Sequence, residues 1–496
     1  MPAAFALLPL VLFVALLVGL RLSAAWAGLA GAAAGLAVAV FAFGYPVGLL
    51  SLAGPAAEAL FTAATIVWIV FPALAIYEFQ QRTGATDTIG RWLGSVSGRP
   101  QTRILLVAWF FALFLEGAAG FGTPVALVAP MLVALGLDPL KALVLALLGH
   151  AAGVSFGAVG TPVVPLLAAA EVDPRLLSLL IVGLHGAVGW ALVVLLFRAA
   201  APERAEERAS WLWPAAAAAL FFVPAGALAW FAGPELPTLG GALVGGVLFA
   251  ALLRWQLAPY GTASAEPAGR VWLATLPYLL VLALILATRL VPANSAWLQD
   301  IRIAWMLGER FGGAVAPLYH PGTMLLLALL LAAALVRPAK GALVASLREA
   351  ALRMPPVIFA LVAVLLLARL MVHGGMIEVL ARSAAGALGA DWPVAAPLVG
   401  ALGSLVTGSA TASNITLGDF QVAAAGAAGL APLLALAGQG FGAGIGNIVA
   451  PHNIVAGAAT VGLVGREGEV LRRTIPICLA CAAAGGLLLL AGQRLV

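Results

Sequence analysis

The chain has 496 residues, of which 63% are hydrophobic and only 9% are charged. Soluble globular proteins carry about a quarter charged residues, so this composition excludes a water-soluble fold. The formal net charge of +5 could indicate binding to nucleic acid, but the basic residues are scattered over short loops, a pattern typical of membrane topology.

Apolar runs of about 20 residues, long enough to cross a bilayer, recur from one end of the chain to the other. They predict an all-α polytopic membrane protein that forms a single membrane domain over residues 1–496. Loops that are alternately rich and poor in Arg and Lys predict that both termini lie outside. The first run is expected to remain as a helix and not to be removed as a secretory signal. The twelve predicted spans are 3–20, 24–43, 56–80, 140–168, 176–198, 211–232, 237–254, 272–291, 321–336, 354–372, 431–464 and 474–493.

Two further segments, 103–136 and 394–428, are long enough for a pair of helices but are interrupted by Gly, Thr, Ser and Pro. We predict that each forms a re-entrant hairpin, which enters and leaves the membrane on the same side. Broken backbone is tolerated at membrane depth only where protein or a wet cavity covers it. The two hairpins therefore mark the region in which a functional cavity is expected.

Parts of the two halves of the chain align at a constant offset of 291 residues. Gly84 falls on Gly375 and Arg91 on Arg382, although shared composition is an alternative explanation. We predict repeat one at 56–254, with hairpin 103–136 and broken helix 140–168, and repeat two at 321–493, with hairpin 394–428 and broken helix 431–464. An odd number of crossings separates the copies, so the repeats are predicted to be inverted. Inverted repeats with broken helices are typical of secondary transporters, which bind substrate near the bilayer midplane.

The hairpin tips and helix breaks carry the candidate binding residues. A break leaves backbone N–H and C=O groups without helical partners, and helix N-termini favour negative charge, so a carboxylate is a suitable ligand. Close packing of helices through small residues is the alternative explanation of the glycines. The candidate substrate-binding residues are Gly120, Gly122, Thr123, Thr161, Ser409, Thr411, Ser413, Asn414, His452 and Asn453.

Charged and titratable groups inside predicted spans are costly and need a reason. Glu116, His150 and Asp419 are candidates for proton coupling, while Arg369 could pair with a substrate carboxylate. Glu116 could instead clamp the first tip, Asp419 could cap a half-helix or hold a cation, and Arg369 could extend to the interface. No metal site is predicted, because Cys478 and Cys481 lie in an apolar run without further ligands.

The stretch Glu116-Gly-Ala-Ala-Gly-Phe-Gly-Thr-Pro-Val-Ala126 resembles the signature of the L-lactate permease family. The resemblance continues through Thr407-Gly-Ser and Ser413-Asn414 to Ala459-Thr-Val-Gly-Leu-Val-Gly-Arg-Glu467. It implies proton-coupled uptake of lactate and glycolate across a bacterial inner membrane. More distantly, Ser413-Asn414 with Thr416 is similar to the hairpin tips of divalent-anion/sodium symporters, which implies a homodimer and an elevator-type movement. The first tip has Gly-Thr-Pro instead of Ser-Asn-Thr, which disfavours sodium as the coupling ion.

We therefore expect a symporter of a proton and a small 2-hydroxy monocarboxylate, embedded in the lipid bilayer, with no cofactor and no nucleic acid partner. A sodium-coupled organic-anion transporter is the second hypothesis, and a channel explains paired inverted breaks less well. A membrane-embedded enzyme is the hypothesis from a different class. It is disfavoured because the sequence contains no H-E-x-x-H motif, no Walker loop and no Cys–His set with ligand spacing.

Overall fold

The computed structural model describes residues 2–16, 20, 22–120, 122–201, 209–256, 267–464 and 466–495. Parts of the features predicted above lie outside these residues. They are residues 17–19 of the first span, Phe121 of the first tip motif and Gly465 of the last quoted motif.

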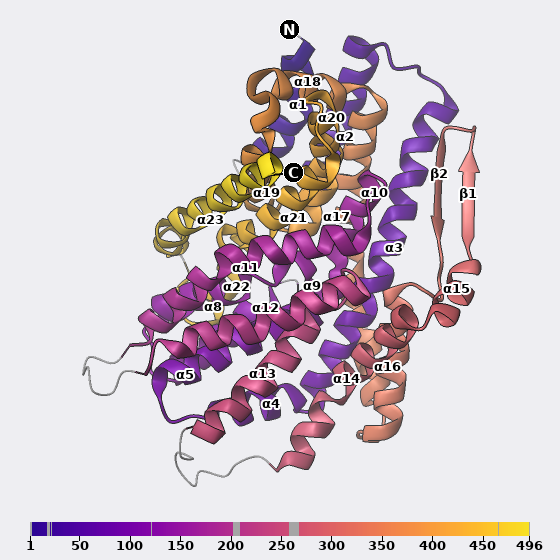
Figure 1. The fold of residues 1–496 in the computed structure, drawn as a ribbon. Helices are drawn as coiled ribbons and strands as arrows, with labels where there is room; N and C mark the ends of the chain where they lie inside the picture. Colours follow the sequence, from indigo (N-terminus) through magenta and orange to yellow (C-terminus); the bar gives the residue numbers. More distant parts are fainter. Residues whose placement is uncertain are drawn as a thin grey trace.

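The described residues form a helical bundle with a small β-hairpin at its side (Figure 1). The elements of the first half are α1 (Pro2–Val14), α2 (Ala24–Phe43), α3 (Leu49–Arg82), α4 (Ala85–Ser95), α5 (Pro100–Ile104), the π-helix η2 (Leu105–Phe111), α6 (Ala112–Ala118), α7 (Thr123–Ala134), α8 (Pro139–Ala151), η3 (Val154–Phe156), α9 (Gly157–Gly160), η4 (Thr161–Val163), α10 (Val164–Ala169), α11 (Pro174–Ala199), α12 (Leu212–Ala232) and α13 (Pro237–Gln256). Those of the second half are α14 (Ala268–Leu290), α15 (Pro292–Asp300), β1 (Ile303–Leu307), β2 (Phe311–Val315), α16 (Pro321–Val336), α17 (Ala342–His373), α18 (Met376–Leu388), η6 (Gly389–Asp391), α19 (Trp392–Thr407), α20 (Ala410–Ala427), α21 (Pro432–Gly446), η7 (Asn447–Val449), α22 (Pro451–Thr460) and α23 (Glu467–Leu495).

This architecture confirms the prediction of an all-α polytopic membrane protein. Within the described ranges, eleven helices are long and apolar enough to cross a membrane, or up to twelve if the pair α8 and η3–α10, bent by 55°, counts as one span. These helices are not all the same as the twelve predicted spans. Helices α1 and α16 are shorter than a full span, whereas the segments Pro100–Ala118 and Met376–Thr407 pass the test of length and hydropathy.

The two segments predicted as hairpins form helix–turn–helix units, and their re-entrant course through the membrane stays a prediction. Hairpin one consists of α5, η2 and α6, a turn at 119–122 and α7; hairpin two consists of α19, a turn at Gly408 and Ser409, and α20. The sequence explains these limits locally. Gly408 adopts the left-handed conformation (φ 74°) that ends α19, and the Ser409 hydroxyl accepts a hydrogen bond from Ala412 N to begin α20.

Small residues let the helices of hairpin two approach their neighbours closely. A Cβ at Gly400 of α19 would lie 2.5 Å from the Gln439 carbonyl oxygen of α21. The predicted packing residues Cys478 and Cys481 are buried free thiols on α23, and Cys478 faces the Ile445 carbonyl of α21. Hairpin two, α21 and α23 thus form one packed layer of the bundle (Figure 1).

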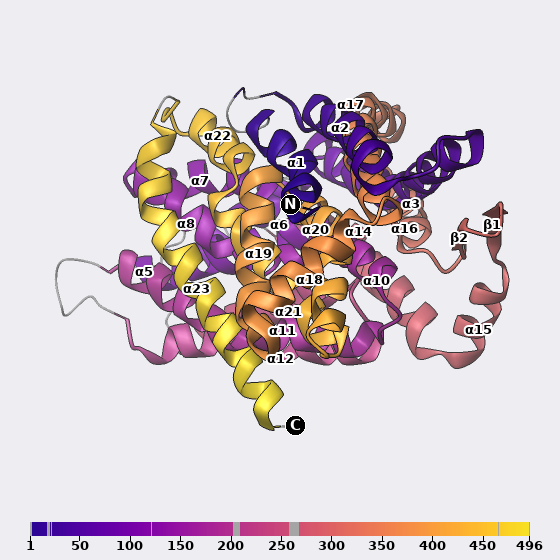
Figure 2. The same ribbon diagram turned by 90° about the horizontal axis from the view of Figure 1, so that it is seen from above.

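The β-hairpin β1–β2 and α15 were not predicted from the sequence. The two strands are antiparallel, with Ile303 opposite Val315, and they pack beside α3, where Phe311 contacts Gly54. Seen from above, they lie at one edge of the bundle, beyond α3 and α16 (Figure 2). Leu307 pairs with Phe311, so the loop consists of residues 308–310, in which Gly308 and Glu309 both have positive φ (60° and 59°).

Similar elements occur in the same order in the two halves of the chain. A helix, a long helix, a short helix, a hairpin, a broken helix and a final long helix run from α2 to α11 and again from α16 to α23. Both short helices begin at a left-handed glycine, Gly84 (φ 69°) and Gly375 (φ 76°), which are 291 positions apart. The predicted repeat bounds, 56–254 and 321–493, stay predictions. The inverted relation of the halves stays a prediction.

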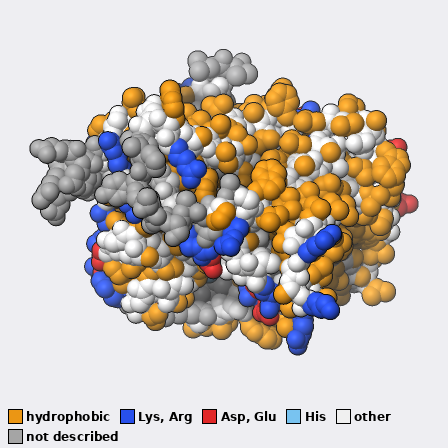
Figure 3. All heavy atoms as spheres, turned by 90° about the horizontal axis from the view of Figure 1, so that it is seen from below, with side chains coloured by type: hydrophobic (Ala, Val, Ile, Leu, Met, Phe, Trp, Pro, Cys, Tyr) orange, Lys and Arg blue, Asp and Glu red, His pale blue; other side chains and the backbone are white. Residues whose placement is uncertain are grey.

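The surface of the bundle carries broad apolar areas, as expected for contact with lipid. Seen from below, Lys and Arg side chains lie in several groups next to hydrophobic surface (Figure 3). Exposed basic residues near the ends of α3, α4, α13 and α14 include Arg82, Arg91, Arg254 and Arg270. These residues belong to loops predicted to lie inside the cell; the orientation itself stays a prediction.

Candidate functional site

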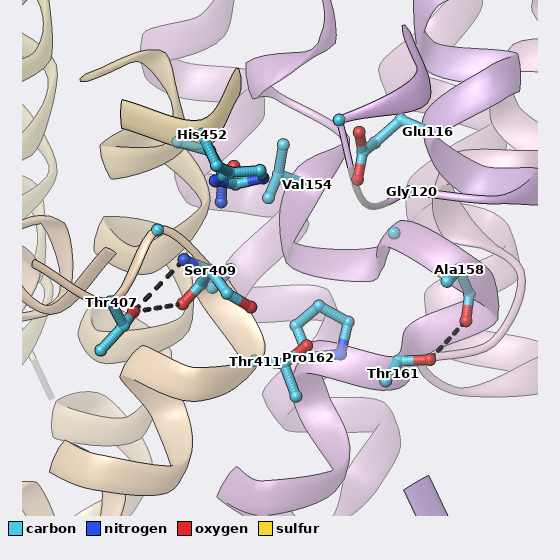
Figure 4. A pocket seen from close by; sticks show the side chains of 15 residues that line it. Glu116, Gly120, Val154, Ala158, Thr161, Pro162, Thr407, Ser409, Thr411 and His452 are labelled. Atoms are coloured by element: carbon cyan, nitrogen blue, oxygen red, sulfur yellow. Dashed lines mark hydrogen bonds between the residues drawn. The ribbon is translucent and has the colours of Figure 1, made fainter. Parts of the chain in front are cut away.

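A cavity of about 300 Å³ lies where the two hairpin tips and the two broken helices meet (Figure 4). Its volume is at the lower end of the range for small-molecule sites. Hairpin one and the first broken helix form one side, and hairpin two with the second broken helix forms the other. The lining residues are Glu116, Gly120, Gly122, Val154, Gly157, Ala158, Thr161, Pro162, Thr407, Gly408, Ser409, Ala410, Thr411, Asn447 and His452.

The tip of hairpin one is built from glycines in the left-handed region. Gly120 (φ 60°) and Gly122 (φ 78°) turn the chain between α6 and α7, and the Thr123 hydroxyl donates to the Gly120 carbonyl at 2.7 Å. Glu116, on the last turn of α6, is 5% exposed. Its Oε1 atom lies beside Gly157, where there is no room for a Cβ atom. The glycine at this position therefore leaves the space that the carboxyl group occupies at the cavity wall.

The first broken helix contains the least usual backbone of the described residues. Ala158 and Val159 have φ of 42° and 54°, a left-handed conformation that costs L-residues free energy and is common at functional sites. The Thr161 hydroxyl donates to the Ala158 carbonyl at 2.6 Å and so holds the break in place (Figure 4). The chain then resumes a helix at Thr161, with its N-terminus at the cavity.

The tip of hairpin two places a second helix N-terminus at the cavity. The Thr407 hydroxyl accepts from Ser409 N at 3.2 Å and donates to the Ser409 carbonyl, which fixes the turn (Figure 4). The Ser409 side chain accepts a hydrogen bond from Ala412 N. The two residues before Ala412, Ala410 and Thr411, line the cavity, and backbone N–H groups in the first turn of a helix have no helical partner.

The second broken helix brings His452 between the two tips. A Cβ at Gly408 would lie 3.0 Å from His452 Nδ1, and one at Gly122 would lie 3.6 Å from His452 Nε2. Next to it, Asn453 Nδ2 donates to Asn447 Oδ1 at 2.6 Å. Asn453 Oδ1 is buried without a hydrogen-bond partner among the described residues.

The arrangement suits a small anion. Helices α7, α20 and α22 all begin at the cavity, next to Gly122, Ser409 and His452. Each N-terminus presents the positive end of a helix dipole, and the first turn of a helix has N–H groups without helical partners. Helix α7 offers fewer of them, because Thr123 N donates to the Gly120 carbonyl and Pro124 has no N–H. Among the described residues, no group of three or more His, Cys, Asp or Glu side chains is arranged to hold a metal ion.

Seven of the candidate residues line this one cavity, although they come from four separate segments of the chain. They are Glu116, Gly120, Gly122, Thr161, Ser409, Thr411 and His452. Four other candidates lie behind the wall: Thr123, Ser413, Asn414 and Asn453. Each of these four side chains donates a hydrogen bond to a neighbouring protein group, although Asn453 Oδ1 has no partner among the described residues.

Ser413 and Asn414 hold hairpin two together. Ser413 Oγ donates to the Gly400 carbonyl at 2.9 Å, and Asn414 Nδ2 donates to the Pro162 carbonyl of the first broken helix at 2.8 Å. Gln439 Nε2 donates to both side chains, at 3.1 and 3.2 Å. Direct contact with substrate was expected of these two residues. The structure instead gives them internal partners, because they lie one turn inside α20 and not at its start.

The three remaining charged or titratable candidates lie apart from the cavity lining. His150 is fully buried on α8, where its Nδ1 atom is 3.0 Å from the Ala146 carbonyl. Arg369 lies between Glu58 and Asp419, at 4.0 and 3.9 Å, so its neighbours are protein carboxylates. The expectation that Arg369 meets the substrate carboxylate is therefore not supported by its position in this structure.

Several lining residues were missed by sequence reasoning. Asn447 is the clearest, because it lines the cavity and accepts from Asn453. The Gly446-Asn447 pair could have indicated it. Asn447 lies four residues before Pro451, and the pair marks the helix end on the other side of the break. Thr407, Gly157 and Ala158 also line the cavity. Thr407 belongs to the Thr407-Gly-Ser motif, but it was not among the candidate substrate-binding residues.

The chain is similar to bacterial permeases in sequence, and it aligns with a solved transporter structure. The chain is 27% identical to the L-lactate permease of Bacillus subtilis strain 168, over 95% of this chain and 92% of that protein. It is 27% identical to the glycolate permease GlcA of Escherichia coli K12, over 98% and 95%. Among solved structures, the YdaH transporter of Alcanivorax borkumensis aligns with a TM-score of 0.48 and 15% identity, over 90% of this chain and 87% of that chain.

The family model described as L-lactate permease matches residues 3–310 and 313–496. Its match and the apolar helices agree in assigning a multi-pass integral protein of the plasma membrane. Because the match spans nearly the whole chain, this protein belongs to the L-lactate permease family.

Proposed function

We propose that the protein carries a small 2-hydroxy monocarboxylate, such as lactate or glycolate, together with a proton across the plasma membrane. The observation that supports this proposal best is the cavity between the paired tips and breaks. It combines helix N-termini with one acidic side chain, that of Glu116, among its described lining residues. The names of the bacterial relatives, lactate and glycolate permeases, point to the same class of cargo.

The substrate carboxylate would accept hydrogen bonds from the N–H groups at the start of α20, at Ala410 and Thr411, and from hydroxyl groups nearby. The helix dipoles of α7 and α22 favour the same negative charge. The substrate hydroxyl would bond to polar groups of the wall such as Asn447. Val154 and Pro162 provide apolar surface for a short side chain. A cavity of about 300 Å³ leaves little room for larger acids.

Coupling to a proton follows from the energetics of the cargo. Moving an anion into a negatively charged interior costs about 2.3 kcal/mol per 100 mV for each charge. A proton that moves with the anion cancels this cost. Glu116 is placed to carry it, because its carboxyl group is almost fully buried at the cavity and is not paired with a basic side chain in any described ion pair.

Alternating access requires that the cavity open to each side in turn. We propose that the hairpins and broken helices move together against the long helix pair α3 and α17, in an elevator-type motion. The homodimer expected for such a carrier is part of the same proposal. Chemical crosslinking in native membranes measures the assembly, and a chain that stays monomeric there would contradict it.

Uptake by the purified protein in proteoliposomes tests the function. With the membrane potential clamped, an alkaline interior should drive accumulation of labelled lactate, whereas no accumulation of lactate or glycolate would refute the proposal. Replacing sodium with choline separates proton coupling from sodium coupling. Conversion of the substrate without movement across the membrane would instead favour an enzyme.

Glu116→Gln tests the proposed proton carrier. The variant should exchange labelled for unlabelled lactate but should lose accumulation driven by a pH gradient. Glu171→Gln is the matched control, because Glu171 is exposed between α10 and α11 and should leave both activities unchanged. Accumulation by Glu116→Gln at the parent level would assign the proton to another group.

A further inference from the structure

A cluster of charged side chains lies at one end of the helix pair α3 and α17. Glu58 Oε2 of α3 lies 2.8 Å from His373 Nε2 and 4.0 Å from Arg369 Nε of α17. Asp419 of hairpin two lies 3.9 Å from the same guanidinium. Gly312 N of the β-hairpin also donates to Glu58, at 3.4 Å. One cation therefore lies between a carboxylate of the long helix pair and a carboxylate of hairpin two.

The other end of the same helix pair carries a second ionic cluster. Arg353 of α17 lies 2.9 Å from Glu78 of α3 and 3.5 Å from Glu349. The two clusters correspond at the offset of 291 residues, because Glu58 falls on Glu349 and Glu78 falls on Arg369. Ion pairs thus join α3 to α17 at both ends, which favours movement of the two helices as one body.

The two ends differ in their connection to the hairpins. Asp419 lies on α20 of hairpin two, and the residue at the corresponding position of hairpin one is Val128, which is apolar and buried on α7. In the described part of the chain, a charged contact from the α3–α17 pair to a hairpin is therefore seen at the Glu58 end, through Arg369 and Asp419.

The contact between Arg369 and Asp419 is weak in geometry. At 3.9 Å the nitrogen and oxygen are too far apart for a hydrogen bond. Arg369 Nε is buried and has no hydrogen-bond partner among the described residues, and its side chain is 20% exposed. Glu58 stays beside Arg369 on the same helix pair, so the guanidinium keeps a carboxylate neighbour if Asp419 moves away.

We propose that Arg369 is a state-dependent anchor for hairpin two, which holds Asp419 in the conformation described here and releases it when the hairpin moves against α3 and α17. The inference rests on the proposed function, because transport requires such a movement. It assigns Arg369 and Asp419 to the balance between two conformations of the carrier, and not to contact with the substrate.

The anchor makes a direct prediction for the two conformations. Asp419→Asn keeps the shape of the side chain but removes its attraction to Arg369. An ion pair of this exposure is expected to shift the ratio of the two conformations by about fivefold. Arg369→Gln should shift the ratio in the same direction. The double variant should shift it no further than the larger single effect, because both changes remove the same contact.

The ratio can be measured by pulsed electron paramagnetic resonance in lipid nanodiscs. Spin labels at Leu49→Cys of α3 and Ala427→Cys of α20, both at exposed positions, report the distance between the helix pair and hairpin two. The background carries Cys478→Ala and Cys481→Ala. Glu78→Gln is the matched control, because it breaks the ion pair at the far end without changing a charge next to the hairpin.

The expected result is a lower population of the parent distance, with the ratio shifted by about fivefold, in Asp419→Asn and Arg369→Gln, and the parent ratio kept in Glu78→Gln. Asp419→Glu retains the negative charge, so its ratio of the two conformations should stay close to that of the parent. This variant distinguishes loss of the ion pair from a folding defect. An unchanged ratio in Asp419→Asn, or an equal shift in Asp419→Glu, would overturn the anchor. Lactate exchange by the parent is measured in parallel, so that failure of the proposed function is recognised separately.

Discussion

Asn414 ties hairpin two to the first broken helix, and its removal should destabilise the fold. In Asn414→Ala the Pro162 carbonyl loses its side-chain donor, and Gln439 Nε2 loses one of its two acceptors. A buried polar group left without a partner costs about 1–3 kcal/mol, and the net value of a lost hydrogen bond is about 1 kcal/mol. The free energy of unfolding should therefore fall by about 2–4 kcal/mol.

Reversible unfolding in mixed micelles of dodecyl maltoside and sodium dodecyl sulfate measures this change, and uptake of labelled lactate gives KM for the same variant. Thr416→Val is the matched control on the same helix, because among the described residues the Thr416 hydroxyl donates within α20, to the Ala412 carbonyl. It should lower the free energy of unfolding by no more than about 1 kcal/mol, the net value of one hydrogen bond. If Asn414→Ala unfolds like the parent while its KM for lactate rises tenfold or more, Asn414 contacts the substrate and our interpretation of it is wrong.

Two further substitutions test the tip of hairpin one and a buried ion pair. Gly122→Ala puts a Cβ in a left-handed backbone, 2.7 Å from Asn453 Oδ1, so KM for lactate should rise by about five- to thirtyfold, the equivalent of about 1–2 kcal/mol. Gly136→Ala is the control, because Gly136 has a similar φ of 94° but open space around the new atom. An equal rise of KM in Gly136→Ala would argue against a role for the tip. Arg289→Gln leaves Glu235, its partner at 2.7 Å, buried without a counter-charge and should lower the free energy of unfolding by about 3–5 kcal/mol. Adding Glu235→Gln should restore most of that loss. A double variant as unstable as the single one would contradict the explanation.

The sequence was most informative where backbone chemistry decides the structure. Gly408 and Ser409 end one helix and begin the next, and such residues are recognisable without knowledge of their neighbours. The positions of both hairpins and both breaks could therefore be predicted, and most of the residues next to the breaks line the cavity. The loop of the β-hairpin also begins at a glycine with positive φ, Gly308, although no strands were predicted there.

The direction of each side chain could not be predicted, because it depends on contacts between distant segments. Asn414 binds the Pro162 carbonyl, 252 positions away, and nothing in its own segment indicates this partner. Arg369 is similar, since its neighbours Glu58 and Asp419 come from α3 and α20. A polar residue inside an apolar run predicts that a partner exists, but the partner may be a substrate, a carbonyl or a second charge, and only the packing of the helices decides among them.

The two ionic clusters that join α3 to α17 also set a length scale. Glu58 and Glu78 are twenty residues apart on α3, which at 1.5 Å per residue is about 30 Å. This is about the thickness of the hydrocarbon core of a bilayer. In lipids with longer acyl chains, one cluster would be drawn into the apolar layer unless the helix pair stood more upright or the bilayer thinned around it. Acyl-chain length should therefore act on the conformational balance of this carrier from the outside, without any ligand.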